Sequence, residues 1–247
     1  MSYQPAGDLW LQFPGHQTAT NYYRDLNISN ATTTVSYEVD GIKYTRKSIA
    51  SLTDNLIAVH LKASKPNALT FNASLNSVHA NKKISINNGL ISLKGKPAKA
   101  EELEPAIEFE ALAKVSTVGG SVKYTTTEVQ VSNATEATIY ISIGTNFKSY
   151  QDVSGNAHEK AMSVINQSSK VNFQTLLNKH VAAYKKFFDR TTLNLGESEQ
   201  AKLPTDERLK VFNQKYDPQF IALYFQFGRY LMIAGSQPNG QPTNLQG

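Results

Sequence analysis

The 247-residue sequence contains no cysteine. This absence excludes disulfide bonds, thiolate metal sites and a cysteine nucleophile, and it removes the usual clue to the redox compartment. A large excess of one charge is also lacking. The sequence has 25 Lys and Arg residues and 20 Asp and Glu residues, which gives a net charge of only +5. The basic residues are scattered instead of forming the stripe with exposed aromatics that nucleic-acid-binding surfaces show. We therefore expect no nucleic-acid partner.

Long apolar runs are missing as well. No stretch approaches the ~20 residues of a membrane-spanning helix, so we expect no membrane association. The segment Met1-Ser2-Tyr3-Gln4 has neither the basic nor the apolar region of a signal peptide. Either the protein is cytoplasmic, or the true N-terminus lies upstream in a longer parent protein, which would then fit a periplasmic or secreted location. The sequence leaves the compartment open.

The first 150 residues have the pattern of antiparallel strands. Leu9, Leu11 and Phe13 alternate with Asp8, Trp10 and Gln12, which is the period of a half-buried strand. Asp40-Gly41 and Asn87-Asn88-Gly89 are hairpin signals, because such turns need positive φ. Further strands are expected at residues 33–39, 42–50, 56–61, 69–75 and 137–143. Residues 107–118 and 121–131 are expected to form one long hairpin around Gly119-Gly120.

The pattern becomes helical after Gly155. Apolar residues recur at steps of three and four from Phe173 to Phe188. Thr205-Asp206-Glu207 marks a helix start. In the last helix Asp217 is a capping residue, Pro218 fits the first turn and Gly235 is the stop signal.

These patterns predict a mainly β fold, an antiparallel β-sandwich followed by a C-terminal helical segment. We assign the sandwich to residues 1–150. Residues 151–247 are predicted to hold a helical linker and the first helix of a truncated helical domain.

Local motifs indicate no active site. The five histidines lie more than four residues apart, and there is no nucleophile elbow, phosphate-binding glycine loop or dinucleotide fingerprint. We therefore predict no metal, no cofactor and no catalytic residue in this chain. His60 and His180, each beside apolar neighbours, fit hydrogen-bonded structural roles better than ligand roles.

Glu108 and Glu110 are two residues apart in a predicted strand, which places both carboxylates on one face about 7 Å apart. An inverting glycosidase uses a carboxylate pair at such a separation. The alternative is a solvated outer face opposite Ile107 and Phe109. We favour the solvated face.

Trp10 is the single tryptophan, and it shares the outer face of its strand with Asp8. An aromatic ring stacks on the C–H face of a sugar, while carboxylates and amides bind the hydroxyls. Asp8, Trp10 and the nearby His16 are therefore the candidate substrate-binding residues. Packing between domains explains the same three residues without a ligand.

The sequence resembles glycoside hydrolase family 95, the α-L-fucosidase type. No single matching segment is specific, but the segments occur in the family's order and together cover nearly the whole chain. The segments are Tyr3-Gln4-Pro5-Ala6-Gly7-Asp8-Leu9, Tyr22-Tyr23-Arg24-Asp25-Leu26, Val35-Ser36-Tyr37, Tyr44-Thr45-Arg46, His180 to Arg190, Leu203 to Leu209, Tyr224 to Leu231, and Asn244-Leu245-Gln246-Gly247.

The resemblance implies an N-terminal β-sandwich, a helical linker and an (α/α) toroid that holds the active site. It also implies an inverting enzyme that releases L-fucose, with a glutamic acid as general acid and with asparagines and an aspartate that position the water. Those residues belong to the toroid, after Leu245-Gln246-Gly247, so none is carried over to this chain. The family's sandwich also begins with a glycine-rich segment before Tyr3-Gln4-Pro5, which is absent here.

Two function hypotheses follow. In the preferred one, the chain is a non-catalytic portion of a fucosidase-like hydrolase, inactive alone. It would brace the missing catalytic domain of the same protein and line part of a pocket for fucosylated glycans. The second hypothesis is a stand-alone carbohydrate-binding β-sandwich.

Overall fold

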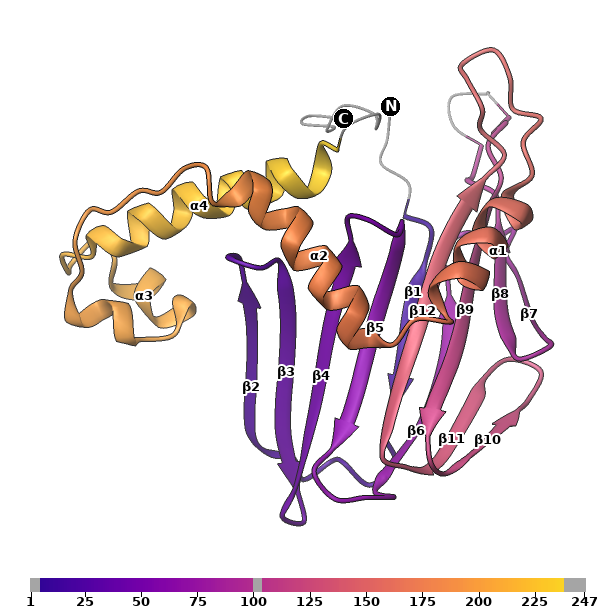
Figure 1. The fold of residues 1–247 in the computed structure, drawn as a ribbon, viewed down its shortest axis with the longest axis horizontal. Helices are drawn as coiled ribbons and strands as arrows, with labels where there is room; N and C mark the ends of the chain where they lie inside the picture. Colours follow the sequence, from indigo (N-terminus) through magenta and orange to yellow (C-terminus); the bar gives the residue numbers. More distant parts are fainter. Residues whose placement is uncertain (1–4, 100–103, 238–247) are drawn as a thin grey trace. The chain divides into compact units, whose positions relative to one another are not determined.

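The computed structural model describes residues 5–99 and 104–237, and the chain divides into two compact units (Figure 1). The first unit holds the residues up to Leu26 and Thr32–His180, and the second holds Asn27–Ala31 and the residues from Val181 onward. The Asn244-Leu245-Gln246-Gly247 segment and the Tyr3-Gln4 positions lie outside the described residues. As predicted, the fold is mainly β, with a C-terminal helical segment.

The first unit contains two antiparallel sheets. The large sheet has the order β2-β3-β4-β5-β12-β9-β8-β7, and the small sheet has the order β1-β6-β11-β10. Their strands are β1 (Asp8–Gln12), β2 (Thr20–Asn27), β3 (Thr32–Val39), β4 (Ile42–Ser51), β5 (Leu56–Ala63), β6 (Leu69–Asn76), β7 (Lys83–Asn87), β8 (Leu90–Gly95), β9 (Phe109–Val118), β10 (Ser121–Tyr124), β11 (Val129–Ala134) and β12 (Glu136–Thr145).

Two of the predicted hairpins are confirmed. Asp40 and Gly41 have φ values of 50° and 72° in the turn between β3 and β4. Asn88 and Gly89 have φ values of 51° and 76° in the turn between β7 and β8. Such positive values at both turn positions match the right-handed twist of the strands they join.

The prediction of one long hairpin around Gly119-Gly120 is wrong. β9 pairs with β8 and β12 in the large sheet, whereas β10 pairs with β11 in the small sheet. Gly119 and Gly120, with φ values of 72° and 69°, therefore carry the chain from one sheet to the other. The turn itself is present, but glycines that allow a sharp turn do not specify which strand the next segment joins.

The main core lies between the inner faces of the two sheets. From the small sheet, Phe71, Val129 and Val131 are at most 1% exposed. From the large sheet, Leu93 and Ile139 are equally inaccessible and belong to the same cluster. Each buried side chain of this size contributes roughly 1.5–3 kcal/mol relative to an exposed one, which makes this cluster the principal source of stability.

A second cluster lies on the outer face of the large sheet. Helix α1 (Ala157–Ser168) and the start of α2 (Phe173–Phe188) cover part of this face (Figure 1). Ile165 of α1 and Leu176 of α2 pack against Leu112 of β9 there. Helix α2 has the bounds that the sequence predicted, whereas α1 was not predicted. Strands β9 and β12 are consequently buried on both faces.

Strand β2 forms one edge of the large sheet and is almost entirely exposed. Tyr22 and Tyr23 are neighbours that point to opposite faces, yet they are 62% and 61% exposed. Asn21 has a φ of 51° at the start of this strand. Neither face of β2 is therefore covered by the described residues.

The second unit contains α3 (Thr205–Val211), α4 (Pro218–Gly235) and a short 3₁₀ helix at Glu199–Lys202. Asp217 caps α4 as predicted, since its Oδ1 accepts a hydrogen bond from the Phe220 N–H at 3.2 Å. Arg208 of α3 donates to both Asp217 oxygens, at 2.8 and 2.9 Å. The Arg208 hydrogen bonds hold the pKa of Asp217 below its ordinary range. This bidentate pair links α3 to the cap of α4.

Arg229 of α4 fixes the end of α2 in the same unit. Its guanidinium donates to the carbonyl oxygens of Phe187, Phe188 and Thr191, at 3.0, 3.0 and 2.8 Å. The last carbonyls of a helix have no partner within the helix, so these bonds satisfy groups that would otherwise need water. Tyr184 of α2 also donates to the Ile28 carbonyl at 2.6 Å.

The packing of α1 on β12 predicts that Gly144→Ala destabilises the first unit. A Cβ at Gly144 would overlap the carbonyl oxygen of Ala157, at the start of α1. We expect a loss of about 1–3 kcal/mol in the free energy of unfolding, measured by urea denaturation and followed by the fluorescence of Trp10.

Gly228→Ala is the matched control for this substitution, because a Cβ at that helical position meets nothing within 4 Å. It should leave the Trp10 transition unchanged and stabilise α4 by about 0.5–1 kcal/mol. An unaltered Trp10 transition in Gly144→Ala would contradict the tight contact.

Candidate functional site

Asp8 and Trp10 lie on the outward face of β1, as the alternation predicted. Their neighbours Leu9 and Leu11 pack against the main core on the opposite face. Trp10 is 53% exposed and is paired across the strands with Ser74 of β6. It lines a shallow hollow of about 260 Å³, together with Gln12, Ser74, Leu75, Asn76, Ile84, Thr127 and Glu128. Asp8 does not line this hollow.

His16 is placed in a different environment from Trp10. Its ring lies among aromatic side chains, with its centroid 5.4 Å from Phe13 and 4.4 Å from Tyr44. Its Nδ1 is 2.9 Å from the Tyr37 hydroxyl. Burial lowers the pKa of His16, although the charge of Asp40 acts in the opposite direction. The structure thus brings Asp8 and Trp10 to one face and keeps His16 among the aromatic side chains.

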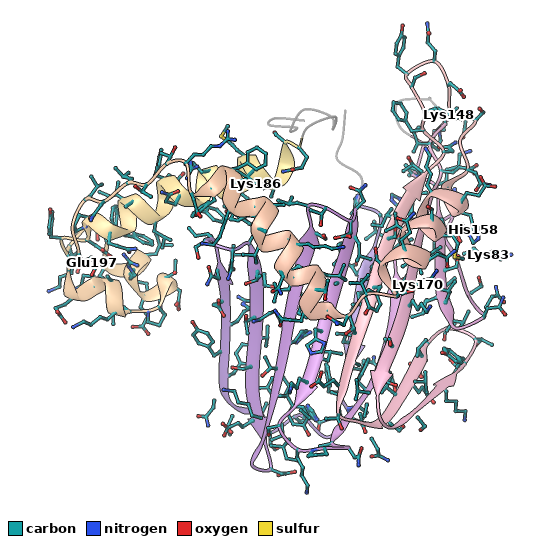
Figure 2. All side chains as sticks on the ribbon, in the orientation of Figure 1. Lys83, Lys148, His158, Lys170, Lys186 and Glu197 are labelled. Carbon is teal, nitrogen blue, oxygen red and sulfur yellow. The ribbon has the colours of Figure 1, made fainter. Side chains whose placement is uncertain are left out.

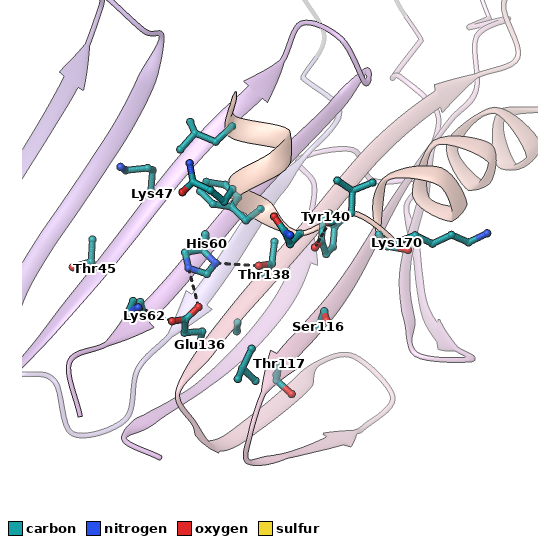
Figure 3. A pocket seen from close by; sticks show the side chains of 18 residues that line it. Thr45, Lys47, His60, Lys62, Ser116, Thr117, Glu136, Thr138, Tyr140 and Lys170 are labelled. Atoms are coloured by element: carbon teal, nitrogen blue, oxygen red, sulfur yellow. Dashed lines mark hydrogen bonds and ion pairs between the residues drawn. The ribbon is translucent and has the colours of Figure 1, made fainter. Parts of the chain in front are cut away.

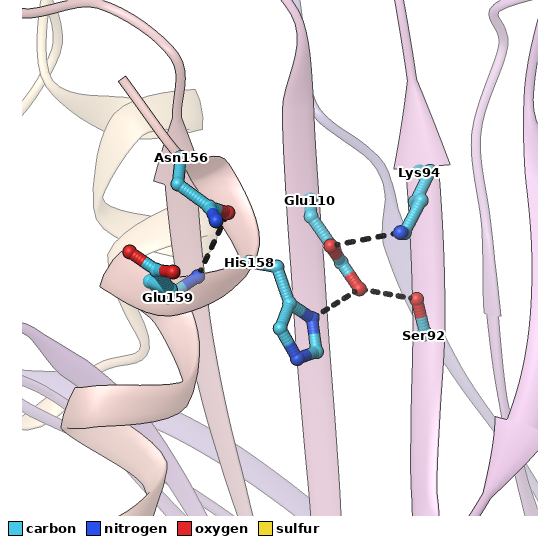
Figure 4. Close-up of polar contacts among 6 residues, drawn as sticks. All are labelled: Ser92, Lys94, Glu110, Asn156, His158 and Glu159. Atoms are coloured by element: carbon cyan, nitrogen blue, oxygen red, sulfur yellow. Dashed lines mark hydrogen bonds and ion pairs between the residues drawn. The ribbon is translucent and has the colours of Figure 1, made fainter.

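Glu110 corrects our interpretation of the Glu108 and Glu110 face as solvated. Glu108 is exposed and lies 3.5 Å from the Lys96 ammonium. Glu110, by contrast, is only 3% exposed. The Ser92 hydroxyl donates to Glu110 Oε1 at 2.6 Å, and the His158 Nδ1 lies 3.1 Å from the same oxygen (Figure 4). Glu108 precedes β9, whereas Glu110 lies in that strand, where α1, which carries His158, covers the sheet.

The Glu110 cluster holds a carboxylate in its charged form. Burial alone would raise the pKa of Glu110, but the hydrogen bonds from Ser92 and His158 and the charge of Lys94 outweigh burial and lower it. Because an ionised carboxylate only accepts hydrogen bonds, the proton of this contact must sit on His158 Nδ1. All three partners hold the carboxylate in place, so the cluster fastens α1 to the sheet and leaves Glu110 unable to reach a substrate.

A groove of about 680 Å³ lies on the outer face of the large sheet, below the start of α2 (Figure 3). Two cross-strand rows form its floor. One row is Lys47, His60, Thr138 and Ser116, and the other is Thr45, Lys62, Glu136 and Val118. The connection from α1 to α2 and the first turn of α2, residues 169–174, form a wall.

His60 is at the centre of this groove. Its Nδ1 lies 3.0 Å from the Thr138 hydroxyl and its Nε2 lies 3.5 Å from the Glu136 carboxylate (Figure 3). Its ring stacks on Phe173 of α2, with centroids 4.8 Å apart. Burial lowers the pKa of His60 despite the opposing charge of Glu136, so the imidazole is neutral at pH 7. These contacts agree with the structural role that the sequence favoured.

His180 is likewise a structural residue. It is 1% exposed, and its Nδ1 accepts a hydrogen bond from the Leu52 N–H at 3.4 Å. In the part of the chain that the structure describes, no three His, Asp or Glu side chains gather in a way that could hold a metal ion. None of the described helices is long and apolar enough to cross a membrane.

Helix α4 carries an exposed apolar stripe. Ile221, Tyr224, Phe225, Leu231 and Met232 recur at helical spacing along one side and are 43–78% exposed. Gly228 lies in the same stripe, and a Cβ there would meet nothing within 4 Å. Phe220 of the same helix faces inward instead, against Phe212 and Arg208.

Comparisons with known proteins identify both parts of the chain. Residues 1–150 match the family model described as glycosyl hydrolase family 65, N-terminal domain. Residues 172–247 match the model described as glycosyl hydrolase family 95 catalytic domain. Both the sandwich and the helices that follow it therefore match domains of glycoside hydrolases.

Two curated relatives narrow the class. The chain is 29% identical to alpha-L-fucosidase 2 of Arabidopsis thaliana, over 99% of this chain and 33% of that protein. It is 26% identical to the probable alpha-fucosidase A of Aspergillus niger, over 100% of this chain and 32% of that protein. By residues 1–150 the chain belongs to the family of the glycosyl hydrolase family 65 N-terminal domain, and its match to the family 95 model and to these relatives makes it similar to the N-terminal portion of α-L-fucosidase-type proteins. It spans about a third of the length of these relatives.

Solved structures give weaker likenesses. A putative kojibiose phosphorylase from the human microbiome aligns with a TM-score of 0.47 and 14% identity, over 69% of this chain and 25% of that one. A bacterial glucoamylase solved with acarbose aligns with a TM-score of 0.43 and 13% identity, over 76% and 32%.

The Glu110 cluster predicts a pH-dependent stability difference between the protein and its Glu110→Gln variant. We expect the variant to be about 1–3 kcal/mol less stable at pH 7, because the buried charge-assisted hydrogen bonds are lost. The lowered pKa of Glu110 means that its carboxylate stabilises the fold at neutral pH, and this contribution is lost as the pH falls below the ordinary glutamate value of 4.5 and through the lower pKa of the folded state. The gap between the two proteins should therefore close over that range.

Glu108→Gln is the matched control, because it removes an exposed carboxylate two residues away, just before β9. It should change the free energy of unfolding by less than about 0.5 kcal/mol at any pH. Urea denaturation at several pH values measures all three proteins. Equal losses in Glu108→Gln and Glu110→Gln would contradict the special role of the buried carboxylate.

Proposed function

We propose that this chain is the N-terminal region of an inverting α-L-fucosidase-type hydrolase and that it braces a helical catalytic domain. The exposed stripe on α4 is the observation that carries the proposal. Residues 172–247, which include α4, match a model described as a catalytic domain. The stripe then packs against further helices of that domain.

The physical case rests on the apolar area of the stripe. Burying a large apolar side chain contributes roughly 1.5–3 kcal/mol, so five such residues supply a strong drive for covering. Side chains at steps of three and four form the ridges that helices use to pack on one another. Gly228 leaves a flat spot in the stripe, where a neighbouring helix can approach closely.

The chemistry agrees with a supporting role. Inverting hydrolysis needs one carboxylic acid and a second group that positions a water on the opposite side of the sugar. Of the carboxylate pair that the sequence singled out, Glu110 is buried by Ser92 and His158 and cannot meet a sugar. The proposal therefore assigns the general acid and the water-positioning groups to the remainder of the parent protein, which acts on fucosylated glycans.

A second candidate function is a carbohydrate-binding sandwich. Its support is the exposed Trp10 over a hollow lined by Gln12, Asn76 and Glu128, which combine an aromatic face with groups that bind hydroxyls. This site would use Asp8 and Trp10 of the predicted residues and not His16. A carbohydrate-binding sandwich would leave the exposed stripe on α4 unexplained, so we prefer the bracing role.

The first prediction is that the purified chain does not release fucose. Incubation with a 2′-fucosylated oligosaccharide, followed by chromatographic detection of free fucose, should give the same signal as buffer. Measurable release would contradict the proposal. Fucose binding without release, if lost in Trp10→Ala, would favour the carbohydrate-binding sandwich.

The second prediction concerns the stripe itself. Combining Tyr224→Ser, Leu231→Ser and Met232→Ser should reduce concentration-dependent self-association of the chain, because the exposed apolar area is removed. Light scattering should show the average mass falling towards the 27.3 kDa of one chain.

Val78→Ser with Tyr150→Ser is the control for the stripe, since these residues are 74% and 87% exposed in the first unit. This variant should associate like the unmodified chain. A purely monomeric unmodified chain at high concentration would contradict the role of the stripe as a packing surface.

A further inference from the structure

The small sheet has an outer face of its own, on the side of the sandwich opposite α1 and the start of α2. These helices pack on the large sheet, and Figure 2 shows His158 of α1 and Lys170, which follows α1, on that side. In β6, buried residues that belong to the main core alternate with residues that are partly or fully exposed. The pairing of the strands therefore fixes which exposed side chains lie next to one another on this face.

Four polar side chains form one row across the face. Gln12 of β1 is paired with Asn72 of β6. Asn72 is paired on its other side with Gln130 of β11, which is in turn paired with Lys123 of β10. Three steps between neighbouring strands, each of about 4.8 Å, give the row a length of about 14 Å. The row is thus longer than a single sugar ring.

A second row lies beside the first and begins with Trp10. Trp10 is paired with Ser74 of β6, two residues along the strands from the first row. Glu128 lines the same hollow as Trp10, and its Oε1 accepts a hydrogen bond from the Gln130 amide at 2.7 Å, which connects the rows. An exposed aromatic face therefore stands at one end of a strip of amide, hydroxyl and carboxylate groups.

Asn72 is an unusual residue for its position. Strand β6 lies between β1 and β11, so Asn72 is in the middle of a central strand. Asparagine is depleted in strands, where β-branched and aromatic residues pack better, so the fold alone does not favour it there. No hydrogen bond joins its side chain to another described residue. Its amide is available to a ligand, which accounts for a residue that the sheet does not need.

The charges of the face favour a neutral ligand. Asp8 and Glu128 lie towards the end that carries Trp10, and Lys123 lies on the edge strand β10. The two carboxylates repel an acidic sugar, while the middle of the face carries uncharged amides and hydroxyls. Amides both donate to and accept from hydroxyl groups, and a tryptophan ring stacks on the C–H face of a sugar. This combination suits a neutral chain of sugars.

We propose that the outer face of the small sheet binds a neutral, extended oligosaccharide across its strands, with one sugar stacked on Trp10 and the next ones held by Asn72 and Gln130. Equatorially linked chains such as β-1,4-glucans fit this face, because they are straight and present flat C–H faces. The proposal rests on the second candidate function, the carbohydrate-binding sandwich, and extends it from the hollow at Trp10 to a row of several sugars. It is independent of the bracing role.

The test uses the fluorescence of Trp10, which is the single tryptophan and therefore reports directly on this face. Titration of the full chain with cellotetraose should shift the emission and saturate. Glucose fills one position only and should bind at least about tenfold more weakly, because the contacts with Asn72 and Gln130 are not made. Tetragalacturonate, a charged chain of equal length, should also bind more weakly, because the carboxylates near Trp10 repel it.

Substitutions separate the row from the ring. Asn72→Ala with Gln130→Ala should weaken cellotetraose binding at least about tenfold, because hydrogen bonds to the ligand are lost. Trp10→Ala, followed by calorimetry, should weaken it by about the same factor. The matched control is Gln174→Ala with Asn178→Ala, which removes the same side-chain types from α2, where the two exposed amides are bonded to each other at 2.8 Å. This control should keep the unmodified affinity.

Any of four results would overturn the proposal. They are the absence of a saturable response to cellotetraose, equal affinity for glucose, full affinity in Asn72→Ala with Gln130→Ala, and equal weakening in the matched control. An unchanged urea transition of Trp10 checks that the row variant is folded. Full affinity in that variant together with a loss in Trp10→Ala would leave the second candidate function standing as a single-sugar site. None of these measurements involves fucose release or self-association, so the bracing role is tested separately.

Discussion

The structure depends on the need to bury both faces of the large sheet. Its inner face packs on the small sheet, and the central part of its outer face packs under α1 and the start of α2. Without this second layer, Leu112 and Tyr140 would be exposed and the Glu110 carboxylate would lose His158. The helices after the sandwich are thus part of its stability as well as a covalent link to the second unit.

The same layer decides which outer surface remains available. Where α1 and α2 cover the sheet, the outward-facing strand residues are apolar or take part in the Glu110 cluster. Beyond the start of α2 the neighbours become Thr138, Lys47 and Ser116, and the groove lies over them. The covered part of the sheet face and the groove are therefore adjacent, separated by the path of a single connection.

Much of this fold could be predicted from local patterns. The alternation around Trp10, the turn at Asp40-Gly41 and the bounds of α2 and α4 all follow from spacing and capping. Helix α1 was missed because only Ala161, Ile165 and Ser168 of its twelve residues are buried, which gives a weak periodic signal. The partner of the strand after Gly119-Gly120 was misjudged because sheet pairing is set by contacts distant in sequence.

The site was less predictable, because it is formed by residues far apart in the chain. The groove joins residues of β4, β5, β9 and β12 with the start of α2, which no local motif reveals. The burial of Glu110 did leave a trace, since Ala111, Leu112 and Ala113 break the alternation and indicate a strand covered on both sides. A sugar contact by Asp8, Trp10 or His16 stays a prediction.

Strand β2 has a consequence for how the sheet ends. An uncovered outermost strand offers its free backbone groups to any extended peptide, which is a route to uncontrolled assembly. The left-handed residue Asn21 distorts the start of this strand, and Arg24 and Asp25 place charges along it. A bent and charged border is a poor template for another strand, so this edge of the widest sheet resists strand addition even though no described strand pairs with its outer side.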